Sequence, residues 1–193
     1  MNGWTETAYG DPAWYLAQRA HTIVRLGPRL HPGETLLDLA CGDGALADHL
    51  PPGVRYRGVD ADAEMVAIAT ARGREVVHAD LNDYVPPDRV AVTTCFRAIY
   101  YARDRRAFFA NVRDYTDKKF VFDLNPRQYH VVDVRADALA AGFKTLELQP
   151  LFVSQRFAVV SPLARAFRVL ERTGPLARAI LRFRFTYVCA ATC

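Results

Sequence analysis

The chain alternates short apolar runs with stretches in which apolar residues recur every three or four positions. A short apolar run between polar or Gly- and Pro-rich segments predicts a buried strand, and the longer period predicts an amphipathic helix. The apolar runs predict strands at Leu36–Ala40, Tyr56–Val59, Glu75–His78, Val90–Cys95, Phe120–Leu124, Lys144–Leu148 and Phe185–Ala190. The periodic stretches predict helices at Trp14–Leu26, Ala45–Leu50, Ala63–Ala71, Arg105–Tyr115 and Val131–Ala141.

The order of these elements favours one fold class. Strands that alternate with helices predict a mostly parallel sheet covered on both faces. We therefore expect an α/β fold with a doubly wound, mostly parallel seven-stranded sheet and helices on both faces. The length of 193 residues suits a single domain over 1–193. Within it we expect an N-terminal helical segment over about 1–30 and an Arg-rich helical insert over about 150–182, between the last two strands.

The net charge of +4 is concentrated in that insert. Residues 156–184 contain seven arginines and one glutamate, so this segment carries +6 and the remainder of the chain −2. Three interpretations follow from its basic and apolar faces. The insert could be a lid over a substrate cleft, a surface for peripheral contact with an anionic membrane, or a site for an acidic substrate.

Several classes of protein are disfavoured by the rest of the composition. No apolar run approaches the ~20 residues that span a bilayer, and the N-terminus lacks the basic and apolar parts of a signal peptide, so we expect a cytoplasmic protein. The four cysteines form no CxxC pair and the five histidines are widely spaced. We therefore expect neither a metal site nor a disulfide.

Candidate chemistry gathers at the ends of the predicted strands. The segment Thr35–Leu50, TLLDLACGDGALADHL, is an apolar run that leads through a glycine-bearing turn into a helix, which is typical of a nucleotide-like ligand site. Because carboxyl ends of parallel strands meet at one edge of a sheet, the residues that follow successive strands should lie close together. These residues are Asp38, Gly42 and Gly44, then Asp60, then Asp80, then Phe96 and Arg97.

The motifs in this region resemble those of the class I S-adenosylmethionine-dependent methyltransferases. They are LLDLACGDG at Leu36–Gly44, YRGVDADAEMV at Tyr56–Val66 and HADLND at His78–Asp83, and the order of elements matches along nearly all of the chain. The resemblance implies a Rossmann-like fold with an antiparallel last strand. It also implies S-adenosylmethionine as the cofactor.

The resemblance assigns expected roles around this cofactor. Asp60 would accept hydrogen bonds from the ribose hydroxyls, and Asp80 would receive the adenine amino group beside the Leu81 backbone. Asp38 and the Ala40–Gly42 main chain would face the amino-acid part of the cofactor. The expected cofactor-binding residues are Asp38, Ala40, Cys41, Gly42, Gly44, Asp60, Ala61, Met65, Asp80, Leu81 and Phe96.

Acceptor contacts are expected from the loops after the fourth and fifth strands and from the N-terminal segment. The expected residues are Tyr9, Arg97, Tyr100, Tyr101, Asn125, Arg127 and Tyr129. His130 is the candidate general base if the acceptor is a hydroxyl or a protonated amine. Nucleic-acid amino-methyltransferases of this fold carry an N-P-P-Y type motif where this chain has Thr94-Cys95-Phe96-Arg97, so nucleic acid is disfavoured as a partner.

Three functions are consistent with these patterns. The first is S-adenosylmethionine-dependent methyl transfer to a small molecule, lipophilic or acidic. The second is an NAD(P)-dependent oxidoreductase, since Gly42-x-Gly44-x-x-Ala47 with Asp60 also fits the dinucleotide fingerprint. Against it stand Asp38, Asp80 and a chain too short for the usual second domain. The third is a partner subunit that binds S-adenosylmethionine without turnover.

Overall fold

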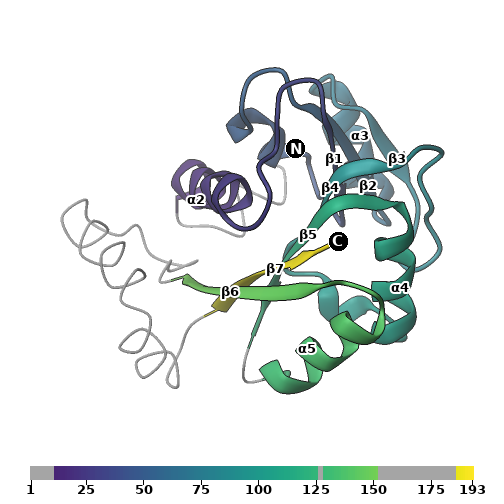
Figure 1. The fold of residues 1–193 in the computed structure, drawn as a ribbon. Helices are drawn as coiled ribbons and strands as arrows, with labels where there is room; N and C mark the ends of the chain where they lie inside the picture. The colour runs from purple at the N-terminus through teal and green to yellow at the C-terminus, as the bar shows by residue number, and fades with distance from the viewer. Residues whose placement is uncertain (1–10, 126–127, 152–185) are drawn as a thin grey trace.

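One seven-stranded sheet, in the order β3-β2-β1-β4-β5-β7-β6, organises the computed structural model, which describes residues 11–125, 128–151 and 186–193 (Figure 1). The strands are β1 Thr35–Leu39, β2 Arg55–Asp60, β3 Val76–His78, β4 Val90–Cys95, β5 Thr116–Leu124, β6 Thr145–Leu151 and β7 Thr186–Thr192. β1 pairs in parallel with β2 and β4, and β7 runs antiparallel to both β5 and β6. The predicted fold class is therefore confirmed, including the antiparallel last strand.

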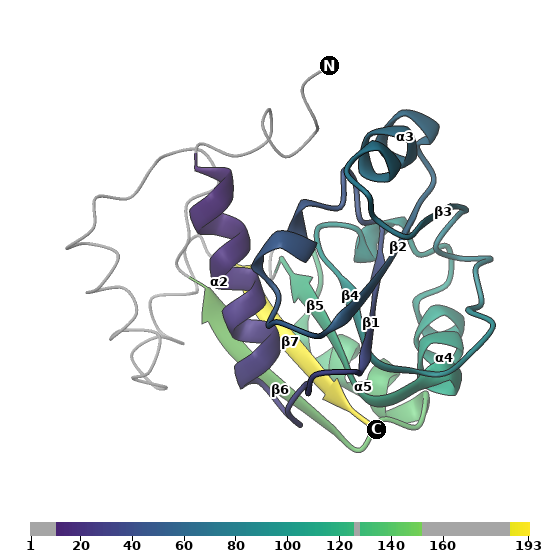
Figure 2. The ribbon, with the colours of Figure 1, turned by 90° about the horizontal axis from the view of Figure 1, so that it is seen from above.

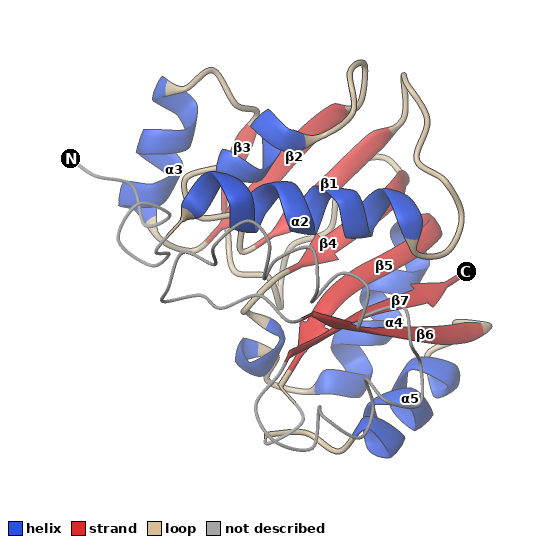
Figure 3. Ribbon diagram, turned by 90° about the vertical axis from the view of Figure 1, so that its left-hand side faces the viewer, coloured by secondary structure: helices blue, strands red, loops and turns tan. Residues whose placement is uncertain are grey.

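Helices cover both faces of the sheet (Figure 2). The helices are α2 Pro12–Arg25, α3 Ala63–Ala71, α4 Arg105–Tyr115 and α5 Val131–Ala140, with short 3-10 helices η1 Ala45–His49 and η2 Ile99–Tyr101. Figure 3 shows α2 crossing in front of the strands, on the side of the sheet opposite α4 and α5. None of the described helices is long and apolar enough to cross a membrane.

Alternation along β5 separates the two cores. Phe120 and Phe122 point to the α4 and α5 side, where they pack with Phe108 and Phe109 in one buried cluster. Val121 points to the other side and packs with Ile23 of α2. Successive side chains of a strand point to opposite faces of the sheet, so this alternation fixes which residues of β5 can contact α2.

Two elements differ from the sequence-based prediction in kind or by more than three residues, whereas the bounds of the others shift by at most three residues. The helix predicted at Ala45–Leu50 is the 3-10 helix η1, because only five residues separate Gly44 from the Leu50-Pro51 break. β5 begins at Thr116 rather than Phe120. Asp117, Lys118 and Lys119 interrupt the apolar pattern there, yet Lys119 is fully buried and its ammonium donates to the carbonyls of Ile23 and Leu26.

The Arg-rich insert lies almost entirely outside the described residues, between the end of β6 and the start of β7. Its helices, its function as a lid and its contact with a membrane stay predictions from the sequence. Tyr9 and Arg127 also lie outside the described part of the chain.

Candidate functional site

A cavity of about 450 Å³ opens at the carboxyl ends of β1 to β4. Its wall is built from the loops after these four strands, as the topology of a parallel sheet requires. The predicted residues that line it are Ala40, Gly42, Asp60, Ala61, Met65, Asp80, Leu81, Phe96, Arg97, Tyr100 and Tyr101. Asp62, Ala79, Asn82, Ala98 and Arg103 also line it and were not singled out from the sequence.

Asp60 joins the glycine loop to the loop after β2. One carboxylate oxygen, Oδ2, accepts a hydrogen bond from the Gly42 backbone N–H at 2.7 Å, and Oδ1 accepts one from the Asp62 N–H at 2.9 Å. Each oxygen keeps further lone pairs for a ligand. Asp60 therefore both shapes the loop and presents an acceptor to the cavity.

Within the part of the chain that the structure describes, backbone strain is concentrated at this cavity. Ala40 has φ +56° and Arg97 has φ +57°, left-handed values that are uncommon for residues with a side chain, and both residues line the cavity. Such conformations persist where surrounding contacts hold them, and they cluster at functional sites. Gly42, with φ +57°, adopts the same region without a steric cost.

Cys41 and Gly44 shape the glycine loop without lining the cavity. A Cβ on Gly58 would lie only 2.7 Å from the Cys41 Sγ, so the Cys41 side chain packs directly against the β2 backbone. Burial raises the pKa of the Cys41 thiol well above its usual range. A Cβ on Gly44 would lie 3.2 Å from the Arg74 side chain. Both positions therefore control how closely the loop approaches its neighbours.

Asp38 is buried, only 5% exposed, and is not part of the cavity wall. Its Oδ1 accepts a hydrogen bond from Thr94 Oγ1 at 2.6 Å, and its Oδ2 accepts one from the Tyr56 hydroxyl at 3.0 Å. Burial raises the pKa of Asp38 to about 7, against the lowering effect of these two hydrogen bonds. The side chain thus links β1 to both neighbouring strands directly below the loop it precedes.

This raised pKa predicts a specific pH dependence of stability. Because the folded protein holds the Asp38 proton up to about pH 7 and the unfolded chain only to about pH 4, Asp38 lowers the free energy of unfolding as pH rises between these values. The slope is roughly 1.4 kcal/mol per pH unit. Asp38→Asn imitates the protonated acid, so urea unfolding should show the variant gaining stability relative to wild type from about pH 4 to about pH 7. If the unfolding free energies of the variant and the wild type change with pH in parallel, the raised pKa of Asp38 is contradicted.

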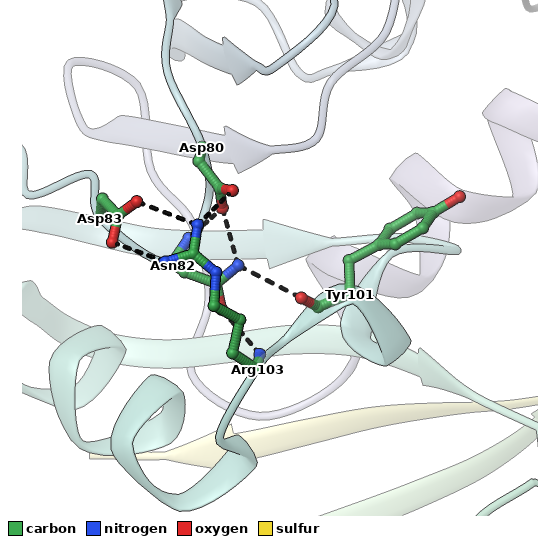
Figure 4. Close-up of polar contacts among 5 residues, drawn as sticks. All are labelled: Asp80, Asn82, Asp83, Tyr101 and Arg103. Carbon is green, nitrogen blue, oxygen red and sulfur yellow. Dashed lines mark hydrogen bonds and ion pairs between the residues drawn. The ribbon is translucent and has the colours of Figure 1, made fainter.

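Asp80 belongs to a hydrogen-bonded cluster that joins two walls of the cavity (Figure 4). Its Oδ1 accepts from the Asn82 backbone N–H at 2.8 Å and from Asn82 Nδ2 at 2.7 Å, and Arg103 Nη2 donates to its Oδ2 at 2.8 Å. The Asn82 hydrogen bonds and Arg103 lower the pKa of Asp80, so the carboxylate is ionised. Arg103 also pairs with Asp83 at 3.2 Å.

Asn82 is the centre of this cluster. Besides its bonds to Asp80, its Oδ1 accepts from the Arg103 backbone N–H at 2.9 Å and its Nδ2 donates to the Tyr101 carbonyl at 3.2 Å. Asn82→Ala should therefore release η2 from the loop after β3. Hydrogen exchange at the Arg103 amide should become about fivefold faster, the effect of one lost hydrogen bond. Asp83→Asn, which keeps every Asn82 contact, is the matched control, and equal exchange in the two variants would contradict this role.

The wall after β4 is aromatic. Tyr100 and Tyr101 are 43% and 64% exposed, and their ring centroids lie 4.5 Å apart. Burial and the neighbouring Tyr101 raise the pKa of Tyr100 to about 12, so its phenol is neutral at physiological pH. With Phe96 and Arg97, these residues give this wall of the cavity an apolar surface beside the Arg97 side chain.

The residues after β5 lie apart from the cavity lining. Asn125 is exposed at the end of β5, and the Tyr129 ring lies 5.2 Å from the Arg105 guanidinium. His130 is exposed and precedes α5. Within the described residues, no three His, Cys, Asp or Glu side chains are grouped to hold a metal ion.

The sheet order distinguishes the two kinds of nucleotide site that the glycine loop allowed. A dinucleotide-binding Rossmann sheet has the order 3-2-1-4-5-6, whereas here antiparallel β7 stands between β5 and β6. This topology, with the cavity at the ends of β1 to β4, defines the class I S-adenosylmethionine-dependent methyltransferase fold. The NAD(P)-dependent alternative is disfavoured.

Comparison with known proteins finds methyltransferases over part of the chain. Residues 36–119 match the family described as "Methyltransferase domain", which confirms the resemblance expected from the motifs. Trans-aconitate 2-methyltransferase from Mycobacterium tuberculosis is 32% identical over 101 residues, a match that covers 47% of this chain and 38% of that relative. The match thus spans well under half of the relative's length.

Solved structures share the fold across most of the chain. The magnesium protoporphyrin IX methyltransferase from Synechocystis PCC 6803, with bound S-adenosylmethionine, has a TM-score of 0.65 at 14% identity, covering 100% of this chain and 85% of that chain. Haemonchus contortus phosphoethanolamine N-methyltransferase 2, in complex with S-adenosyl-L-methionine, has a TM-score of 0.64 at 16% identity, covering 95% and 53%. At these identities the likeness concerns the fold.

Proposed function

We propose that this protein binds S-adenosylmethionine in the cavity and transfers its methyl group to a small acidic molecule. The main support is that Asp60, the last residue of β2, and Asp80, just after the neighbouring β3, line one cavity together with Ala40 and Gly42. Two carboxylates at the ends of neighbouring strands suit the ribose hydroxyls and the base amino group of one nucleoside. The relatives crystallised with this cofactor have the same fold.

The residues of the cavity fit the cofactor's parts one by one. Asp60 offers lone pairs to the ribose hydroxyls, and the ionised Asp80 accepts from the adenine amino group. Met65 and Leu81 supply apolar surface for the adenine ring. When bound, S-adenosylmethionine supplies an electrophilic methyl group on a sulfonium, and the protein's contribution is to align the acceptor and exclude water.

The choice of an acidic acceptor follows from the titratable groups of the wall. Among the described lining residues there is no histidine, and Tyr100, with a pKa of about 12, is neutral. An acceptor that arrives ionised, such as a carboxylate, needs no base to remove a proton. Arg97 also lines the cavity, and its guanidinium complements a negative charge on the acceptor. The relative named trans-aconitate 2-methyltransferase supports this class.

Calorimetric titration followed by turnover tests the proposal. S-adenosylhomocysteine should bind and NADH should not. With S-adenosylmethionine, a panel of small di- and tricarboxylates should yield S-adenosylhomocysteine, whereas their amide analogues should not. Absence of S-adenosylhomocysteine binding would refute the cofactor. Binding without turnover on any acceptor of the panel would instead favour a non-catalytic partner subunit.

A further inference from the structure

Helix α2 is attached to β5 by two buried cationic contacts. Near the helix C-terminus, the Lys119 ammonium donates to the carbonyls of Ile23 and Leu26. Nearer the N-terminus, Arg19 Nη2 pairs with Asp123 Oδ2 at 2.9 Å, with side chains only 1% and 6% exposed. Lys119 and Asp123 lie four residues apart on the face of β5 that α2 covers, so each contacts a different part of the helix.

The Asp123 contact reaches the cavity wall. Its second oxygen, Oδ1, accepts a hydrogen bond from the Arg97 backbone N–H at 2.6 Å. The Arg19 guanidinium carbon lies 4.7 Å from the centre of the Phe96 ring. Phe96 and Arg97 both line the cavity. One buried ion pair therefore contacts two consecutive residues of the wall from behind.

The backbone at Arg97 requires such support. Its φ of +57° is disfavoured for a residue with a Cβ and persists only where neighbouring contacts hold it. A hydrogen bond from a backbone N–H to a carboxylate is stronger than one to a neutral oxygen, and Asp123 supplies it. Burying an ion pair, in contrast, gives little net stability compared with apolar side chains of similar size. Stability alone does not account for two charges at this place.

We propose that Asp123 is a positioning residue: held by Arg19, it fixes the left-handed turn at Arg97 and so the Phe96–Arg97 wall of the cofactor cavity. The inference rests on the proposed function, because ligand affinity is one of its readouts. It assigns α2 a part in shaping the site, although α2 itself lies on the other side of that wall.

Two double variants separate positioning from the loss of charge. Arg19→Met with Asp123→Asn removes both charges and keeps an oxygen that accepts from the Arg97 N–H. Arg19→Met with Asp123→Leu removes both charges and that acceptor. The first should bind S-adenosylhomocysteine within about threefold of wild type, and the second about tenfold or more weakly, the range expected when one hydrogen bond to a charged group is lost.

A third variant and a second readout complete the experiment. Lys119→Met loosens α2 at its other contact and should lower the urea midpoint without changing the affinity for S-adenosylhomocysteine. Hydrogen exchange at the Arg97 amide, which needs no ligand, should be accelerated only in the Asp123→Leu double variant. Equal Arg97 protection in both double variants would overturn the inference. If the Arg97 amide exchanges faster only in the Asp123→Leu double variant, but the wild-type protein does not bind S-adenosylhomocysteine, the proposed function alone is overturned.

Discussion

The Asp60→Ala variant is expected to bind S-adenosylhomocysteine about 5- to 150-fold more weakly than wild type, corresponding to about 1–3 kcal/mol. The substitution removes the acceptor proposed for the ribose hydroxyls. It also removes the acceptor of the Gly42 and Asp62 N–H groups, so the glycine loop loses its connection to the loop after β2. Calorimetric titration measures the affinity directly.

A control that changes the same charge makes this result specific. Asp48 lies in η1, is exposed and pairs with Arg74, and it does not line the cavity. Asp48→Ala should bind S-adenosylhomocysteine as wild type does. If Asp60→Ala remains folded, with an unchanged urea midpoint, and binds equally well, the carboxylate has no part in ligand recognition.

The Phe109→Ala variant is expected to lose about 3–5 kcal/mol of unfolding free energy. Phe109 is fully buried, and its ring lies 5.4 Å from that of Phe122 and 5.9 Å from that of Phe120. Truncation removes the buried ring and leaves a cavity that these strand residues cannot fill. Since domains of this size are stable by only about 5–15 kcal/mol, urea unfolding should shift markedly.

Leu139→Ala provides the comparison for this loss. Leu139 lies on α5, on the same side of the sheet, but is 45% exposed. Its truncation should cost less than about 1 kcal/mol. Similar losses for the two variants would contradict the assignment of Phe109 to the centre of the α4–α5 core.

The sequence predicted the elements well where local pattern decides them. α3 at Ala63–Ala71 and β4 at Val90–Cys95 have the predicted bounds. Asp62 caps the start of α3, and β4 is a short run of apolar and β-branched residues. The start of β5 could not be found in this way. Lys119 reads as a surface residue until α2 places two carbonyls above it.

In the candidate site, too, the features set by position in the chain were predictable, and the contacts made through tertiary structure were not. The acids at strand ends, Asp60 and Asp80, were visible because their position in the chain alone brings them to one edge of the sheet. The partners of Asp38 were not, since Tyr56 and Thr94 reach it only through strand pairing. The contact of Asn82 with the Arg103 loop likewise depends on how η2 returns over the cavity, which no local pattern encodes.

A crystal structure of the protein with S-adenosylhomocysteine would show whether Asp60 and Asp80 hold one adenosyl group. We expect the ligand in the cavity at the ends of β1 to β4, with a ribose hydroxyl about 2.7–3.2 Å from the Asp60 carboxylate and the adenine amino group at a similar distance from Asp80. Adenosine density elsewhere on the protein, or a ribose turned away from Asp60 within this cavity, would contradict it.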